Sequence, residues 1–298
     1  MDRIERYPIL GLLGKGGMAR VFKVNIPVID KVAALKLLWP DPTLQELLGG
    51  DTLETLFTAE ARILGALNHP HVVGIWAFDT WHGRPFYLMD YHPLHLGHLM
   101  GESARPDDPS RVIPVERALD YVGQILLGLD RLHHSDIIHR DIKPHNMLIH
   151  GEHQIKIGDF GLSRRQGVSF RGPRHLKVGS PGYAAPEQME DPQAADARAD
   201  IYAVGAMLLR MLSGRLPEPG QALPPLSATH SDLDPSWDSF LESALAPNPS
   251  KRYPSAAAML DALTERVEHW RRQQEQTCAL AGEDSPLSAS PEPEATAA

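Results

Sequence analysis

The chain has 298 residues, of which 42% are hydrophobic and 22% are charged. This composition is ordinary for a globular protein and excludes fibrous, collagen-like and wholly disordered chains. The net charge is −9, with 29 basic against 38 acidic residues. Such a balance provides no general attraction to nucleic acid or to an anionic membrane, so we expect no nucleic-acid partner.

The single cysteine, Cys278, excludes an intramolecular disulfide framework and fits a reducing compartment. The charged N-terminus lacks the apolar segment of a secretory signal. The most apolar window, residues 201–212, is interrupted by Arg210 and is too short to span a bilayer. The 15 histidines show no metal-ligand spacing. We therefore expect a cytoplasmic protein without a membrane span.

The first part of the chain predicts a small antiparallel sheet with one helix packed on it. Runs of β-type residues bounded by Gly, Pro, Asp and Asn predict strands at 7–13, 19–24, 32–38, 72–79 and 85–91. Between the third and fourth strands, apolar residues from Leu53 to Leu67 recur near helical spacing. Asn68-His69-Pro70 ends that helix.

After Tyr91 the pattern becomes helical. Residues 115–133 carry one apolar stripe, residues 200–213 are apolar almost all round, and residues 237–245 and 256–270 are further helix candidates. The chain therefore predicts a β-rich lobe and a larger helical lobe that join near residues 91–96, and ligands usually bind between lobes. Residues 276–298 are rich in Ala, Ser, Pro and Glu and predict a disordered acidic tail.

A glycine-rich run, Gly14-Lys15-Gly16-Gly17, lies between the first two predicted strands. Glycines allow backbone N–H groups to approach phosphate oxygens without obstruction by a Cβ, and Val21 could cover a flat base. Taken alone, the run fits a plain glycine hairpin equally well. A Rossmann fold is excluded because the glycines precede a strand and not a helix.

A lysine, Lys36, interrupts the apolar third strand. An unpaired buried ammonium is costly, so this lysine needs partners. Glu60 on the following helix can supply one carboxylate and phosphate oxygens the other. The alternative is a lysine on an edge strand whose stem covers apolar surface while its charge stays in water.

Three further runs follow in order: His139-Arg140-Asp141, Asp159-Phe160-Gly161 and Ala185-Pro186-Glu187. With the glycine loop and Lys36 they resemble the motif set of the protein kinase superfamily over residues 7 to about 270. The Gly-Gly-Met loop and the segment from Gly179 to Tyr183 resemble bacterial eukaryotic-like serine/threonine kinases.

The resemblance implies an α+β, bilobal protein kinase-like fold. The N-lobe, about 7–91, would be a small antiparallel sheet with one main helix, and the C-lobe, about 92–270, would be larger and mainly α-helical. The implied activity is phosphorylation of serine and threonine hydroxyls on protein substrates by ATP, with Mg²⁺ as cofactor and Mn²⁺ as an alternative. An activating partner or a dimer stays open.

The resemblance also assigns site residues. Asp141 would accept the proton of the substrate hydroxyl, Lys143 would stabilise charge on the moving phosphoryl group, and Asn146 and Asp159 would hold the metal ions. Ser180 would belong to the substrate-positioning segment. The residues assigned to ATP binding are Leu13, Gly14, Lys15, Gly16, Gly17, Val21, Ala34, Lys36, Glu60, Met89, Asp90, His92 and Leu148.

Two features depart from the family pattern. Ala19 replaces the third glycine of the loop, and the segment from Asp159 to Glu187 contains no threonine. Ser169, which Arg164, Arg165 and Arg171 flank in the sequence, is our hypothesis for an autophosphorylation site. The alternative is a segment that is ordered without a phosphate.

Two other functions compete with an active protein kinase. One is a nucleotide-binding pseudokinase scaffold, and the other is a kinase for small molecules. The first is disfavoured because the chain keeps the whole set Lys36, Glu60, Asp141, Asn146 and Asp159. The second is disfavoured by the Ala-Pro-Glu segment, which small-molecule kinases usually lack. The same resemblance pairs Glu187 with Arg252 as a buried ion pair.

Overall fold

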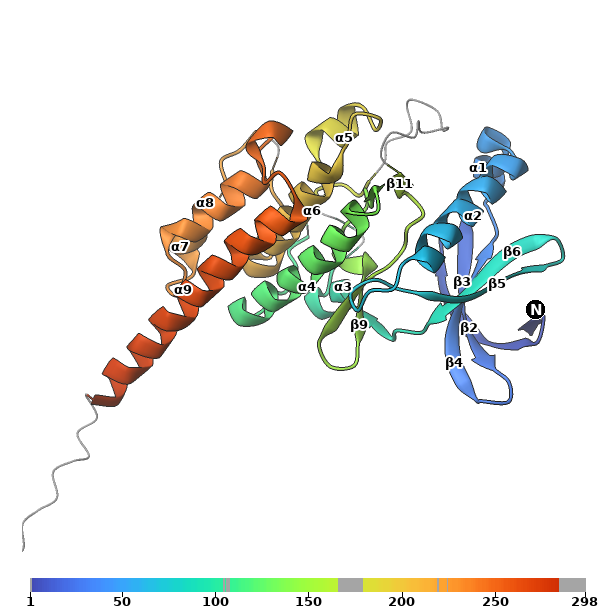
Figure 1. Ribbon diagram of the computed structural model, residues 1–298, viewed down its shortest axis with the longest axis horizontal. Helices are drawn as coiled ribbons and strands as arrows, with labels where there is room; N and C mark the ends of the chain where they lie inside the picture. Colours follow the sequence, from blue (N-terminus) through green and yellow to red (C-terminus); the bar gives the residue numbers. More distant parts are fainter. Residues whose placement is uncertain are drawn as a thin grey trace, which may run out of the picture.

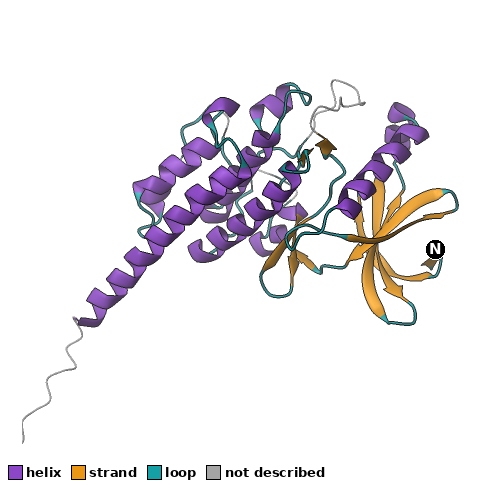
Figure 2. Cartoon of the chain, viewed as in Figure 1, coloured by secondary structure: helices purple, strands orange, loops and turns teal. Residues whose placement is uncertain are grey.

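The computed structural model describes residues 2–103, 105, 108–165, 179–218, 220–223 and 225–283. The described chain forms two lobes (Figure 1). Strands gather in the N-terminal lobe and helices in the larger C-terminal lobe (Figure 2). The predicted α+β bilobal fold is confirmed.

The N-terminal lobe is built on a six-stranded antiparallel sheet with the order β1-β2-β3-β4-β6-β5. Two helices, α1 and α2, precede β5 in the chain. The bounds are β1 Arg3–Ile4, β2 Tyr7–Lys15, β3 Ala19–Ile26, β4 Lys31–Leu38, α1 Pro42–Leu48, α2 Gly50–Ala66, β5 Ile75–Trp81 and β6 Arg84–Asp90.

Strand β4 is central and positions the lysine of the site. Successive side chains of a strand point to opposite faces. Leu35 and Leu37 pack with Phe22 and Phe86 in one apolar cluster, and Lys36 therefore lies on the opposite face, toward α2. Helix α2 presents Leu53, Phe57, Glu60, Ala61 and Leu64 to the interior at helical spacing, so the lysine and Glu60 face each other.

The C-terminal lobe contains the remaining elements. They are β7 Leu94–His95, α3 Leu96–Met100, α4 Val115–His133, β8 Ile137–Ile138, η1 Pro144–Asn146, β9 Met147–His150, β10 Gln154–Ile157, β11 Arg164–Arg165, α5 Pro186–Glu190, α6 Ala197–Ser213, α7 Leu226–Thr229, α8 Pro235–Ala244, η2 Pro249–Lys251 and α9 Ala256–Glu283. Strands β10, β9 and β7 form a small sheet, and β11 pairs with β8.

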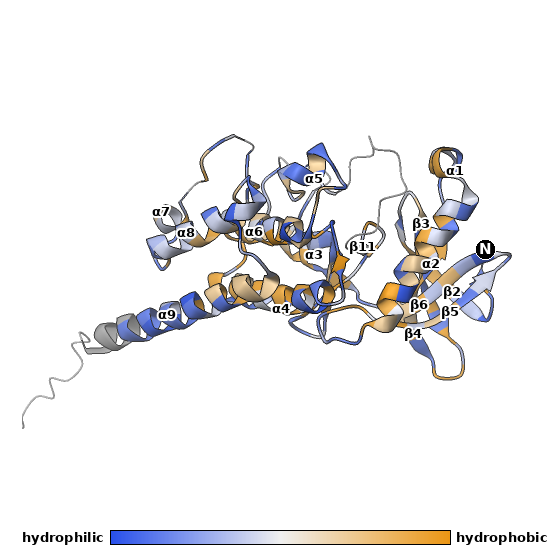
Figure 3. Ribbon diagram, turned by 45° about the horizontal axis from the view of Figure 1, so that its top comes forward, coloured by the Kyte–Doolittle hydropathy of each residue, from blue (hydrophilic) through white to orange (hydrophobic). Residues whose placement is uncertain are grey.

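The core of this lobe lies around α4 and α6. Helix α6 is buried almost all round, from Ala199 to Leu212, as its composition predicts, and α4 buries a stripe that includes Val122, Ile125 and Leu129. Apolar residues accordingly gather on the inner helices, and the outer part of α9 is hydrophilic (Figure 3). Within the described residues, no helix has both the length and the apolar character that a membrane crossing requires.

Three expectations about elements differ from the structure. The strand predicted at 72–79 begins only at Ile75, because Val73 N donates to Ile157 O at 2.9 Å and Val72 bridges the same residue. Helix α1 was not predicted, although Asp41-Pro42 is a good helix start: the Asp41 carboxylate accepts from Leu44 N at 2.8 Å.

The third difference lies at the C-terminal end. Helix α9 continues to Glu283, so the expectation that a disordered tail begins at residue 276 is wrong for residues 276–283. Gln, Ala and Leu in this stretch are good helix formers, which accounts for the extension. Residues 284–298 lie outside the described part of the chain.

Candidate active site

A cavity of about 1500 Å³ lies between the lobes and contains most of the predicted site. The residues that line it and were assigned to ATP are Leu13, Gly14, Lys15, Gly16, Gly17, Val21, Ala34, Lys36, Met89, Asp90, His92 and Leu148. Asp141, Asn146 and Asp159 line it as well. Glu60, Lys143 and Ser180 lie outside the lining, and each reaches it through a contact given below.

The glycine run forms the turn between β2 and β3. The last paired residues are Lys15 and Arg20, and Gly16 N donates to Ala19 O at 2.9 Å. A Cβ placed on Gly14 would meet no atom of the protein within 4 Å. Packing within the protein therefore does not require a glycine at position 14. Because glycine has no Cβ, a ligand can approach the backbone closely there.

Lys36 is buried and ion-paired on two sides. Its Nζ lies 2.8 Å from Glu60 Oε1 and 2.9 Å from Asp159 Oδ1. Burial by itself would lower the pKa of Lys36, but the charges of Asp159 and Glu60 outweigh burial and raise the pKa well above its ordinary value. The lysine therefore stays cationic at the edge of the cavity and can attract phosphate oxygens.

Glu60 is held so that it orients this lysine. Its Oε1 accepts from the Tyr87 hydroxyl at 3.0 Å and from Phe160 N at 3.2 Å, in addition to Lys36. These donors come from β6, from the segment after β10 and from β4. One carboxylate on α2 thus links the helix to the sheet and to the Asp159-Phe160-Gly161 run.

The run His139-Arg140-Asp141, which we call the catalytic loop, is held by the buried carboxylate of Asp200 on α6. His139 N and Arg140 N donate to it at 2.9 and 2.8 Å, and His133 Nε2 lies 2.9 Å from Oδ2. Arg140 has a φ of 65°, which is uncommon for a residue other than glycine. The two backbone bonds to Asp200 hold the loop in that conformation next to the proposed base.

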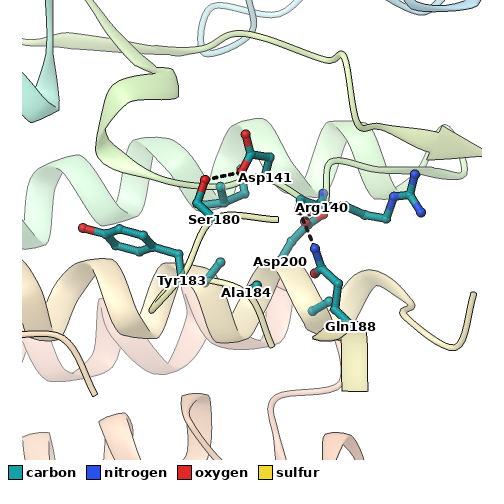
Figure 4. Close-up of a pocket in the computed structure, with 10 residues that line it drawn as sticks. Arg140, Asp141, Ser180, Tyr183, Ala184, Gln188 and Asp200 are labelled. Atoms are coloured by element: carbon teal, nitrogen blue, oxygen red, sulfur yellow. Dashed lines mark hydrogen bonds between the residues drawn. The ribbon is translucent and has the colours of Figure 1, made fainter. Parts of the chain in front are cut away.

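The Asp141 carboxylate makes three polar contacts. Asn146 Nδ2 donates to its Oδ2 at 3.0 Å, and Lys143 Nζ lies 2.8 Å from the same oxygen. The Ser180 hydroxyl donates to Oδ1 at 2.8 Å, as Figure 4 shows, and in turn accepts from Lys143 Nζ at 2.8 Å. The structure therefore brings the three residues that the resemblance assigns to catalysis, Asp141, Lys143 and Asn146, together with Ser180 of the predicted substrate-positioning segment.

The residues proposed to hold metal offer suitable ligands. Asn146 and Asp159 present amide and carboxylate oxygens, the donors that Mg²⁺ prefers. Gly158 N donates to Asn146 O at 2.9 Å, so the two residues lie on adjoining backbone. In the described chain no three His, Cys, Asp or Glu side chains could hold a metal ion by themselves.

The expected ion pair between Glu187 and Arg252 is formed. Two guanidinium nitrogens lie 2.7 Å from the two carboxylate oxygens, and the Arg252 side chain is fully buried. Arg252 Nε also donates to Ala246 O at 2.7 Å. The pair ties α5, which follows the substrate segment, to the helical core.

Two more residues of the site region differ in what the structure describes. Ser169 lies outside the described residues. Gln188, which sequence reasoning missed, donates from Nε2 to Arg140 O at 2.7 Å (Figure 4). Only its place directly after Ala-Pro-Glu could have pointed to it.

Protonation of Asp159 should weaken the fold in acid. Its pKa is lowered from 3.8 to about 2, chiefly by the charge of Lys36. Because the folded-state pKa is the lower one, the stabilisation is present above pH about 4 and is lost as the pH falls toward about 2. The Asp159 side chain is 55% exposed, so solvent screens the pair and the loss should be small.

Urea unfolding at pH values across this acid range, for the wild type and Asp159→Asn, measures that contribution. The variant should lose less stability than the wild type as the pH falls. Parallel pH profiles of the two proteins would contradict this account of the pKa.

Comparison with known proteins identifies the family of this chain. A profile of the protein kinase domain matches residues 7–263, and the chain therefore belongs to the protein kinase family. It is 33% identical over 279 residues to the serine/threonine-protein kinase PksC of Streptomyces coelicolor, covering 86% of this chain and 48% of PksC. It is 30% identical over 276 residues to PknB of Mycolicibacterium smegmatis, covering 86% and 42%.

A solved structure is similar as well. The kinase domain of PknI from Mycobacterium tuberculosis superimposes with a TM-score of 0.64 at 26% identity, covering 89% of this chain and 97% of that one. These relatives bear out the resemblance to bacterial eukaryotic-like serine/threonine kinases. The chain spans less than half the length of PksC and PknB.

Proposed function

We propose that this protein is an ATP-dependent serine/threonine protein kinase. The observation that carries the proposal is the hydroxyl of Ser180, which lies 2.8 Å from both the Asp141 carboxylate and the Lys143 ammonium. A kinase needs its substrate hydroxyl in such a place, beside a carboxylate that accepts the proton and a cation that stabilises the transferred charge.

The residues at the interlobe cavity beside Asp141 would meet the other requirements of phosphoryl transfer. Phosphoryl transfer depends mainly on in-line positioning and on neutralising phosphate charge. Lys36, fixed by Glu60, would hold the phosphates that the glycine loop covers. Asn146 and Asp159 would hold the Mg²⁺ or Mn²⁺ ions, and a divalent cation there neutralises charge on the phosphate oxygens.

We place the nucleotide base in an apolar slot of the cavity, where backbone groups can form hydrogen bonds with its edge. Val21, Ala34 and Leu148 line the same cavity from both lobes, and a flat ring between them would lose water contact on both faces. The carbonyl of Asp90 and the backbone N–H of His92 are the groups we assign to hydrogen bonds with the base. Met89 directly precedes Asp90 in β6 and lines the same cavity.

The same proposal extends to regulation and location. Ser169 is the candidate autophosphorylation site because arginines flank it in the sequence. We place the catalytic domain at residues 7–270 and the protein in the cytoplasm, with protein substrates. The alternative to a phosphate on Ser169 is a segment that is ordered without one, and an activating partner or a dimer stays open.

Transfer of labelled γ-phosphate from Mg-ATP, to the protein itself and to a generic basic protein, tests the proposal. The wild type should incorporate label on serine or threonine, Asp159→Asn should not, and phosphopeptide mapping should find Ser169. Label confined to other residues would overturn the Ser169 assignment alone. An absence of label in the wild type, with Mg-ATP still raising the melting temperature, would favour the pseudokinase scaffold.

A further inference from the structure

A buried carboxylate outside the proposed chemistry lies in the loop after α3. Glu102 follows Gly101, which ends α3 in the left-handed conformation with a φ of 60°, and Glu102 N donates to Gly97 O at 2.9 Å. The side chain is 6% exposed. A carboxylate removed from water to this extent is costly unless several partners compensate it.

Three elements supply those partners. The Tyr183 hydroxyl, from the segment that contains Ser180, donates to Glu102 Oε1. Arg210 Nε, from α6, lies 3.5 Å from the same oxygen. His145 Nδ1, from η1, lies 3.2 Å from Oε2. Glu102 thus joins the substrate segment, the central helix and η1.

The pKa shifts of Glu102 and Tyr183 show which of the two donates the hydrogen bond. Burial by itself would raise the pKa of Glu102, but the bonds from His145 and Tyr183 and the charge of Arg210 outweigh it and lower the pKa. Burial, with the nearby carboxylate, raises the pKa of Tyr183. The pair at neutral pH is therefore an ionised carboxylate that accepts from a neutral phenol, the stronger kind of hydrogen bond.

Tyr183 and His145, the partners of Glu102, are both close in the chain to residues of the proposed reaction site. Tyr183 N donates to Ser180 O at 3.1 Å, and Ser180 is the residue whose hydroxyl contacts Asp141. In Figure 4 the Tyr183 ring points away from that contact, so its hydroxyl is free to reach Glu102. His145 immediately precedes Asn146 in η1. Glu102 itself does not line the interlobe cavity, whereas His145 does.

We propose that Glu102 is a positioning residue for the protein substrate, which acts through Tyr183 and His145 on the segment around Ser180. This inference rests on the proposed kinase function and adds a residue that lies outside the motifs named above. Because Glu102 contacts the segment that contains Ser180 and does not line the interlobe cavity, its loss should weaken binding of the protein substrate and spare ATP.

A double-mutant cycle with Glu102→Gln and Tyr183→Phe tests this role. Glu102→Gln preserves the shape and removes the charge, and Tyr183→Phe removes only the hydroxyl. Each variant should raise KM for a generic protein substrate about tenfold, as expected for the loss of a charged hydrogen bond, with KM for ATP unchanged. The double variant should be impaired less than the product of the two single effects, because both variants weaken the hydrogen bond between Tyr183 and Glu102.

The matched control is Glu152→Gln, an equal change of charge at an exposed position in the turn between β9 and β10. It should leave both KM values at the wild-type level. Additive effects in the cycle, or an equal rise in KM for ATP, would overturn the proposal. So would a lowered melting temperature with an unchanged KM for the protein substrate, which indicates a structural role only.

Two further outcomes keep the tests separate. If Glu102→Gln does not fold, Tyr183→Phe alone decides, since it leaves Glu102 paired with Arg210. A wild type that transfers no phosphate would overturn the proposed function, whereas an active wild type with unaffected variants would overturn only the role of Glu102.

Discussion

Replacement of Asp141 by asparagine should lower kcat for phosphoryl transfer about 10²- to 10⁴-fold, the usual contribution of a positioned general base. An amide has nearly the same shape as the carboxylate but cannot accept the proton of the substrate hydroxyl. The contact from Ser180 at 2.8 Å and that from Lys143 at 2.8 Å show where this carboxylate acts. ATP binding should persist, because Lys36 and Asp159 are unchanged.

Steady-state transfer of phosphate to a generic protein substrate measures kcat, and the shift of the melting temperature with Mg-ATP measures binding. Asp261→Asn is the control, because Asp261 is exposed on α9 far along the chain from the site. It should retain the wild-type kcat. A kcat near the wild-type value in Asp141→Asn would exclude Asp141 as the base.

Replacement of Arg252 by alanine should lower the free energy of unfolding by about 3–5 kcal/mol, the usual cost of breaking a buried ion pair from one side. The guanidinium makes two bonds of 2.7 Å to Glu187 and is fully buried. Its removal leaves the Glu187 carboxylate, whose side chain is only 16% exposed, without its partner. It also removes the donor to Ala246 O.

Urea denaturation of the wild type and of Arg252→Ala at neutral pH measures this loss of unfolding free energy. The matched control is Arg198→Ala, which removes an arginine paired with Asp196 at 2.6 Å with both side chains about one-third exposed. A surface pair of this kind contributes about 0–1 kcal/mol. Equal effects of the two substitutions would show that burial of the Arg252 pair adds nothing to stability.

The periodicity of apolar residues predicted the helices and strands in which the same face is buried along the whole element. Helix α6 is apolar almost all round in the sequence and is buried almost all round in the structure. The alternation of β4 places Lys36 opposite Leu35 and Leu37, and the spacing of apolar residues in α2 places Glu60 inward. These local patterns made the ion pair possible but left an edge-strand lysine as the alternative, and the family resemblance was needed to choose between them.

The periodicity of apolar residues gave a wrong strand start where a short apolar run could pair with either of two strands. Val72 and Val73 read as the start of a strand, but their backbone pairs with Ile157 of β10 in the other lobe. A short apolar stretch does not specify which strand it will join. The competing partner is 84 residues further along the chain for Val73, so no local pattern could identify it.

The kinase motifs located the chemistry but not all of its supports. Lys36, Asp141, Asn146 and Asp159 were predicted from their runs, and the structure places all four at the interlobe cavity. Glu102 has no motif and lies in an irregular loop, 81 residues from Tyr183. Its partners are determined by tertiary packing alone, and a single sequence contains no pattern for such contacts.

The most direct test of the account is a single-turnover measurement of label transferred from γ-labelled Mg-ATP, with the acceptor amino acid identified. The wild-type chain should transfer the label to serine or threonine, and Asp141→Asn, mixed with the same nucleotide and protein substrate, should transfer almost none. Equal transfer by both proteins, or label found on tyrosine, would contradict the assignment of this site to a serine/threonine protein kinase.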